Sequence, residues 1–148
     1  MVEVNRTFQV RQPPGVVLEY LQDFSRAEEW DPGTVSCARV DSGPIQVGSR
    51  WKNVSKFMGN KTELTYELVQ LDDERVVFRG ENKSATATDD IDVRPGTEPG
   101  AAAVTYRAHI DFRGAAKLAT PLAKVEFERT GDNTVIALTE ALGRWTRA

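Results

Sequence analysis

The chain has 148 residues, of which 40% are apolar and 28% charged, and its formal net charge is −3. This length fits an ordinary domain, and we expect residues 1–148 to form a single domain with its own core. Basic and acidic side chains are interspersed, which argues against a nucleic-acid partner. No apolar run approaches the roughly 20 residues of a transmembrane helix, and the N-terminus lacks a signal-peptide pattern. We therefore expect a cytoplasmic protein with no integral membrane association.

The N-terminal part of the chain changes from a strand pattern to a helical one. Residues 3–10 (EVNRTFQV) alternate polar and apolar side chains, which predicts a strand. Residues 14–24 carry apolar side chains at three- and four-residue spacings, which predicts a helix begun by proline. Ser25 is the predicted N-cap of a short second helix over residues 26–30. The Asp-Pro-Gly sequence that follows predicts a turn capped by Asp31.

Trp30 lies at the break between this second helix and the turn. Its size suits a plug in the corner between the two short helices and the next strand, near Trp145. The alternative is that its indole forms the end wall of a cavity.

From residue 34 the pattern has a period of two for about eighty residues, with short turns between the segments. The six predicted strands cover residues 34–41, 49–57, 62–71, 75–82, 85–93 and 103–112. The predicted turns include residues 58–61, 72–73 and 94–101. Successive strands joined by short turns indicate an antiparallel meander.

After Gly114 the period becomes helical and stays so to the C-terminus. We expect one long helix that begins near Pro121 and is kinked at Gly131, because a mid-helix glycine costs roughly 1 kcal/mol. The alternative is two helices in series. One face starts with small residues, which would leave room for a ligand cavity unless bulky side chains of the sheet fill it. Leu118, Leu122 and Val125 project to the other side, as a cavity rim or a subunit contact.

The order strand, two helices, six strands, long helix resembles the polyketide cyclase/dehydrase and lipid-transport-like family of the START-like (SRPBCC, birch-pollen-allergen-like) superfamily. Three segments carry the resemblance: VVLEYLQDFSRAEEWDPG, VGSRWKNVSKFMGNKTELTYELVQLDDERVVFRGEN, and AVTYRAHIDFRGAAKLATPLAKVEFERTGD. The resemblance implies an α+β helix-grip fold, in which a seven-stranded curved antiparallel sheet wraps around a long C-terminal helix, with two short helices between strands 1 and 2. It also implies that an apolar or aromatic small molecule binds between sheet and helix.

Strand alternation predicts which side chains face this cavity. The predicted ligand-binding residues are Trp51, Asn53, Ser55, Phe57, Leu64, Tyr66, Phe78, Asn82, Asp89, Ile91, Tyr106, Ala108, Thr120, Ala123, Phe127 and Gly131. This set combines aromatic walls with a few polar groups, which is the usual composition of a small-molecule pocket.

Asp89 is the candidate catalytic residue, because a carboxylate facing a poorly hydrated cavity has a raised pKa and can act as a general base. The alternative is that Asp89 belongs to a solvated strand end. His109, the only histidine, is expected to face solvent, and Cys37, the only cysteine, is expected to be buried. One histidine and one cysteine cannot supply a good zinc site, so we predict no metal and no cofactor.

Three functions are compatible with these features. The favoured one is binding of a small hydrophobic molecule, lipid- or polyketide-like. The second is an enzyme of the cyclase/dehydrase type with Asp89 as base. The third is a protein-interaction or stress-associated module without a ligand, which predicts a filled cavity and an exposed apolar patch. The sequence leaves open whether the chain is a monomer or a homodimer.

Overall fold

The computed structural model describes residues 1–57 and 59–146, and within these residues seven strands form one antiparallel sheet in the order β1-β7-β6-β5-β4-β3-β2. The strands are β1 (Val2–Val10), β2 (Thr34–Arg39), β3 (Arg50–Phe57), β4 (Asn60–Leu71), β5 (Arg75–Glu81), β6 (Ala85–Pro95) and β7 (Ala102–Phe112). Each predicted strand is confirmed to within a few residues. The predicted turn at 58–61 includes Met58, which lies outside the described residues.

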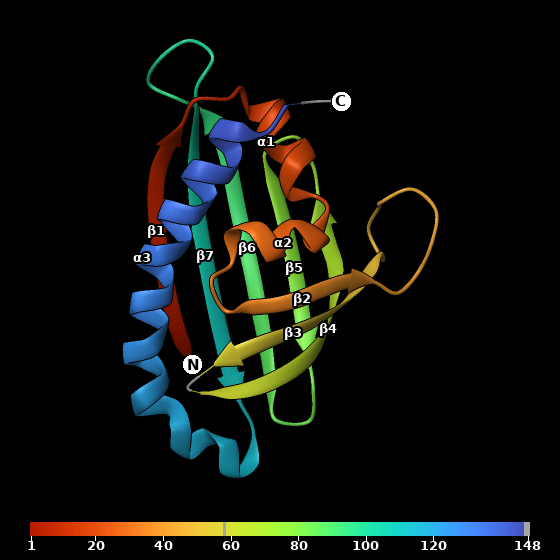
Figure 1. Cartoon of the computed structure of the whole chain (residues 1–148), viewed down its shortest axis with the longest axis vertical. Coiled ribbons are helices and arrows are strands. Elements are labelled where there is room, and N and C mark those ends of the chain that lie inside the picture. Colours follow the sequence, from red (N-terminus) through yellow and green to blue (C-terminus); the bar gives the residue numbers. More distant parts are fainter. Residues whose placement is uncertain (58, 147–148) are drawn as a thin grey trace.

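The long helix lies against one edge of the curved sheet. Figure 1 shows α3 running along β1 and β7, while β2, β3 and β4 curve over the same side of the sheet. Helices α1 and α2 lie between these two parts and cover the middle of the concave face. The expected arrangement of a curved antiparallel sheet around a C-terminal helix is confirmed.

The helical segment after β1 is divided into three short pieces. These are α1 (Pro14–Leu21), a 3-10 helix η1 (Phe24–Arg26) and α2 (Ala27–Trp30). The predicted cap at Ser25 is wrong, because the Asp23 carboxylate accepts hydrogen bonds from both the backbone N–H and the hydroxyl of Ser25. The predicted turn cap is confirmed, since the Asp31 carboxylate accepts from the Gly33 N–H at 3.0 Å and the Thr34 hydroxyl at 2.9 Å.

The C-terminal segment begins as a 3-10 helix, η2 (Gly114–Ala119), and continues as α3 (Thr120–Arg144). The helix is continuous through Gly131, so the alternative of two helices in series is wrong. A Cβ atom on Gly131 would lie 2.5 Å from Cγ2 of Val4 in β1. Glycine therefore allows close packing of α3 on the sheet at this point, rather than breaking the helix.

Phe24 is the centre of an aromatic cluster under η1. Its ring centroid lies 4.4 Å from that of Phe78, 6.2 Å from Trp51 and 6.1 Å from Trp30. Trp30 is 1% exposed, which fits its expected role as a plug in the corner after α2. It does not pack beside Trp145, whose ring instead meets Tyr20 edge-on at the far end of α3.

Exposed apolar side chains gather where η2 meets α3. Leu118, Leu122 and Val125 are 86%, 71% and 63% exposed. Among the described residues, no helix is long and apolar enough to span a membrane.

Candidate functional site

A cavity of about 270 Å³ lies between the sheet and the start of the long helix. Its lining residues come mainly from β3, β4, β6, β7, η2 and α3. The apolar wall includes Phe57, Leu64, Ile110, Phe112 and Phe127. The rings of Phe57 and Phe127 meet edge-on, with their centroids 6.2 Å apart, and so join α3 to the β3 side of the cavity.

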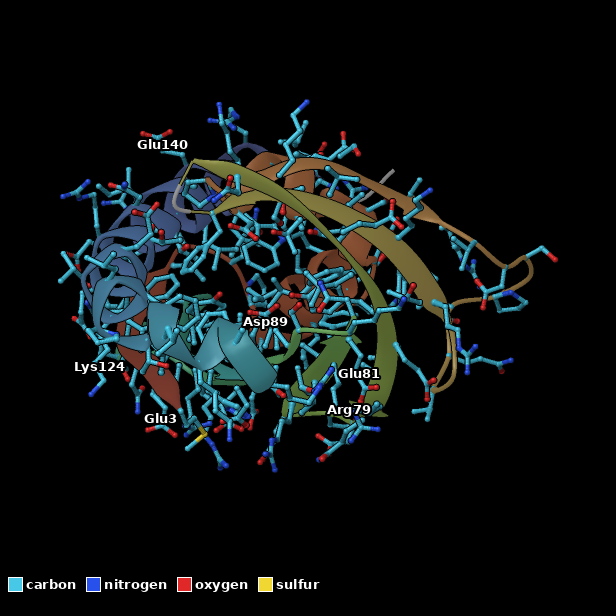
Figure 2. All side chains as sticks on the ribbon, turned by 90° about the horizontal axis from the view of Figure 1, so that it is seen from below. Glu3, Arg79, Glu81, Asp89, Lys124 and Glu140 are labelled. Atoms are coloured by element: carbon cyan, nitrogen blue, oxygen red, sulfur yellow. The ribbon has the colours of Figure 1, made fainter. Side chains whose placement is uncertain are left out.

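Asp89 and Tyr106 form the polar inner end of the cavity. The Tyr106 hydroxyl donates a 2.8 Å hydrogen bond to Oδ1 of Asp89, and both side chains are buried. Figure 2 shows Asp89 pointing into the interior, whereas Arg79 and Glu81 lie on the outside. The sheet register pairs Asp89 with Phe78 and Tyr106 with Ile91, and both of these partners are fully buried. The cavity therefore ends where the packed core begins.

The electrostatics of this inner end follow from burial. Burial, followed by the negative charge of Asp31, raises the pKa of Asp89 to about 7, and the hydrogen bond from Tyr106 lowers it. Burial and the charge of Asp89 raise the pKa of Tyr106 and that of Tyr66 well above the usual value. At neutral pH both tyrosines are protonated and can donate hydrogen bonds, and the pKa of Asp89 lies close to the ambient pH.

Asp31 brings a second carboxylate to the cavity from the turn after α2. Burial raises its pKa, and the hydrogen bonds from Gly33 and Thr34 lower it. Thr34 also accepts a hydrogen bond from Asn53, which in turn accepts one from Ser55. A chain of hydrogen bonds thus runs along the β2–β3 wall, from Asp31 to Ser55.

Nine of the predicted ligand-binding residues line the cavity. They are Ser55, Phe57, Leu64, Tyr66, Asn82, Asp89, Tyr106, Ala108 and Phe127. Asn82 lies at the β5–β6 turn, where its side-chain carbonyl oxygen accepts the N–H groups of Ser84 and Ala85 and its amide donates to the Glu63 carbonyl. Both the carbonyl oxygen and the amino group of the Asn82 side chain are therefore already hydrogen-bonded within the protein.

The remaining predicted residues lie outside the lining. Trp51, Phe78 and Ile91 belong to the sealed core, where Phe24 of η1 occupies the space that a ligand would need. Asn53 is 1% exposed, and its side-chain amide is already hydrogen-bonded to Thr34 and Ser55.

The small-residue start of α3 also leaves less space than expected. Gly131 packs on Val4, Ala123 is fully buried, and Thr120 is half-buried without reaching the lining. At Gly131 a side chain of the sheet, that of Val4, fills the space beside the helix, which is the alternative to a ligand cavity given in the sequence analysis.

The cavity also contains residues that the sequence-based prediction missed. These are Asp31, Gly33, Lys56, Asn60, Thr62, Ser84, Ala85, Ala87, Thr88, His109, Ile110, Phe112, Ala116 and Thr130. The alternation that predicted Tyr106 and Ala108 extends to Ile110 and Phe112, so these two could have been found. Asp31 could not, because its position depends on how the turn after α2 folds over the sheet.

Cys37 and His109 are the only cysteine and the only histidine of the chain. Cys37 is buried, as predicted, and burial raises the pKa of its thiol to about 12. His109 is half-buried on β7, where it alternates with the inward-facing Ala108, and part of the residue borders the cavity. Within the described part of the chain, no group of three or more His, Cys, Asp or Glu side chains is arranged to hold a metal ion.

Solved structures of similar fold cover almost the whole chain. A START superfamily protein from Mycobacterium smegmatis superposes with a TM-score of 0.79 at 11% identity, covering 97% of this chain and 99% of that one. The Zhui aromatase/cyclase from Streptomyces sp. R1128 gives a TM-score of 0.80 at 16% identity, covering 99% and 96%. A protein from Thermus thermophilus gives 0.77 at 18% identity, covering 95% and 96%. These likenesses establish the helix-grip fold.

A search of curated protein sequences finds no significant match. The profile of the family described as polyketide cyclase / dehydrase and lipid transport matches residues 1–142. Family and fold together indicate either hydrophobic ligand binding or cyclase-type activity, and the chain belongs to the polyketide cyclase/dehydrase and lipid transport family.

Proposed function

We propose that the chain binds a small, mostly apolar molecule in the cavity, with a polar end toward Asp89, Tyr66 and Tyr106. The observation that carries this proposal is the apolar-walled cavity of about 270 Å³ that ends in a buried carboxylate and two tyrosines. Drug-sized ligands occupy pockets of roughly 300–1,000 Å³, so this volume favours a compact molecule of one or two rings. An open cavity is also not what the interaction-module hypothesis predicts.

The test uses a neutral two-ring probe, 2-naphthylmethanol, and isothermal titration calorimetry. The wild-type protein is expected to bind the probe, and Ala108→Leu is expected to reduce binding at least tenfold, because Ala108 lines the cavity and the larger side chain occupies it. Ala38→Leu is the matched control, since Ala38 is exposed on β2 and outside the cavity. Equal binding by wild type and Ala108→Leu would refute the proposed site.

A second function is favoured by one specific observation, the 2.8 Å hydrogen bond from Tyr106 to a carboxyl whose pKa is about 7. A carboxylate with this pKa can take a proton from a carbon beside a carbonyl, as cyclisation and dehydration require. The Tyr66 hydroxyl can donate to the carbonyl oxygen, where negative charge develops. This is the cyclase/dehydrase hypothesis with Asp89 as the base.

Proton abstraction can be measured without knowing the natural substrate. With 2-tetralone as the probe, NMR follows deuterium exchange at the carbon beside the carbonyl. The wild-type protein is expected to accelerate this exchange, and Asp89→Asn is expected to abolish the acceleration while still binding the ketone. The same exchange rate in both proteins would remove Asp89 as the base.

A further inference from the structure

The aspartates of β6 differ in their partners according to the face of the sheet. On the outer face, Asp90 pairs with Arg75 at 2.6 Å and Asp92 pairs with Arg107 at 2.7 Å. On the inner face, Asp89 is 8% exposed and belongs to none of the ion pairs among the described residues. The chain thus supplies cations to the outward carboxylates and none to the buried one.

The second carboxylate of the cavity, that of Asp31, also lacks a cationic partner among the described residues. Asp31 accepts hydrogen bonds from Gly33 and Thr34, which are neutral donors, and it forms no ion pair with any described residue. Its charge acts on Asp89 strongly enough to raise the pKa of that group. The basic residues at the lining are Lys56, which is exposed, and His109, which is half-buried, and neither is paired with these carboxylates.

Two polar atoms at the inner end have unused hydrogen-bonding capacity. Among the described residues, Oδ2 of Asp89 and the hydroxyl of Tyr66 have no hydrogen-bond partner, whereas Oδ1 of Asp89 is bonded to Tyr106. The fully enclosed, unpartnered side-chain atoms of the described structure are the indole nitrogens of Trp30 and Trp51. The two free atoms at the inner end are not among these, so a molecule in the cavity can reach them.

We infer that the ligand is an amine: a compact one- or two-ring molecule that carries a single protonated nitrogen, which pairs with Asp89 under the added negative potential of Asp31. This inference rests on the proposed function and names the ligand class for the same site. A cation restores the charge balance that the protein leaves open, and its attraction is strong because the carboxylate is withdrawn from water. The ammonium group donates to the free Oδ2 of Asp89, and the rings lie against Phe57 and Phe127.

Other ligand charges fit this inner end less well. A neutral alcohol can donate one hydrogen bond to Asp89 but leaves both carboxylates without a counter-charge. A carboxylate ligand would bring a third negative group to the cavity, which costs free energy in a poorly hydrated site. The charge of the probe is therefore the variable that tests the inference.

The experiment compares three probes of one shape: 2-naphthylmethylamine, 2-naphthylmethanol and 2-naphthoate. Dissociation constants are measured by titration calorimetry with the wild-type protein at about pH 8, where Asp89 is mostly ionised and the amine still mostly protonated. The amine is expected to bind at least tenfold tighter than the alcohol, and the naphthoate weakest. If the alcohol or naphthoate binds as tightly as the amine, the inference is wrong and the proposed function stands. If none of the three binds, both are wrong.

Two variants then locate the effect. Asp89→Asn is expected to reduce the preference for the amine over the alcohol to threefold or less, and Asp31→Asn should reduce the preference partially. Asp73→Asn, an exposed position in the β4–β5 turn, removes the same charge away from the cavity and should keep the full preference. An unchanged preference in Asp89→Asn would overturn the assignment. The wild-type comparison decides the ligand class even if a variant fails to fold.

Discussion

The ring of Tyr66 lies directly on the backbone of Gly80, where an added Cβ atom would be 2.7 Å from the ring carbons Cε2 and Cζ. The two residues face each other across β4 and β5 in the sheet register. A side chain at position 80 would displace the ring. Glycine therefore allows the ring to lie where its hydroxyl is at the inner end of the cavity.

Gly80→Ala is therefore expected to affect both stability and binding. Overpacking at a buried position typically costs about 1–3 kcal/mol of unfolding free energy, and the displaced ring should weaken binding of the naphthalene probes severalfold. Urea denaturation and titration calorimetry measure the two effects. Gly143→Ala is the matched control, because its Cβ meets no atom within 4 Å and should raise stability by about 0.5–1 kcal/mol. A neutral effect of Gly80→Ala would show that Tyr66 is free to move.

Gly131→Ala should destabilise the protein even though alanine favours a helix more than glycine does. The new Cβ would lie 2.5 Å from Cγ2 of Val4, so either the Val4 side chain or α3 must shift. We expect a loss of about 1–3 kcal/mol, measured by urea denaturation. In the double variant with Val4→Ala, the loss should be smaller than the sum of the two single losses, because the clash is removed. Additive losses would contradict the close contact.

The sequence was most informative where one periodicity persisted. The period of two from residue 34 to 112 predicted the strands and their inward faces, and so brought Asp89, Tyr106 and Phe57 to the cavity. It could not predict that Phe24 fills the middle of the concave face, since the position of η1 depends on tertiary packing. For this reason Phe78 and Ile91, which have the correct inward alternation, belong to the core instead of the cavity.

Phe127→Ala and Leu122→Ala should affect stability differently, because Phe127 belongs to the cavity wall and Leu122 to the exposed patch on the same helix. Phe127 lines the cavity and meets Phe57 edge-on, so its loss should cost about 1–2 kcal/mol and weaken probe binding. Leu122 is 71% exposed, and its replacement should change stability by less than about 0.5 kcal/mol. Urea denaturation checks both values. A large cost at Leu122 would contradict its exposure and indicate that a second copy covers the patch in solution.

The pH dependence of stability should report on Asp89. Its pKa is raised from 3.8 to about 7, first by burial and then by Asp31. Between these two values the folded protein holds a proton that the unfolded chain has released. The stabilisation associated with that proton is therefore present at low pH, falls as the pH rises through this window, and is gone above about pH 7. Asp31, whose pKa burial also raises, acts in the same direction.

Asp89→Asn isolates this contribution, because asparagine keeps the shape of the side chain without the titration. Relative to this variant, the wild type should lose up to about 4 kcal/mol of unfolding free energy between pH 4 and pH 8. Urea denaturation of both proteins across this range measures the difference. Asp73→Asn, at an exposed turn, should follow the wild-type profile at every pH. If the Asp89→Asn profile runs parallel to the wild type instead, then Asp89 titrates alike in the folded and unfolded chains, and its carboxyl is hydrated in the empty cavity.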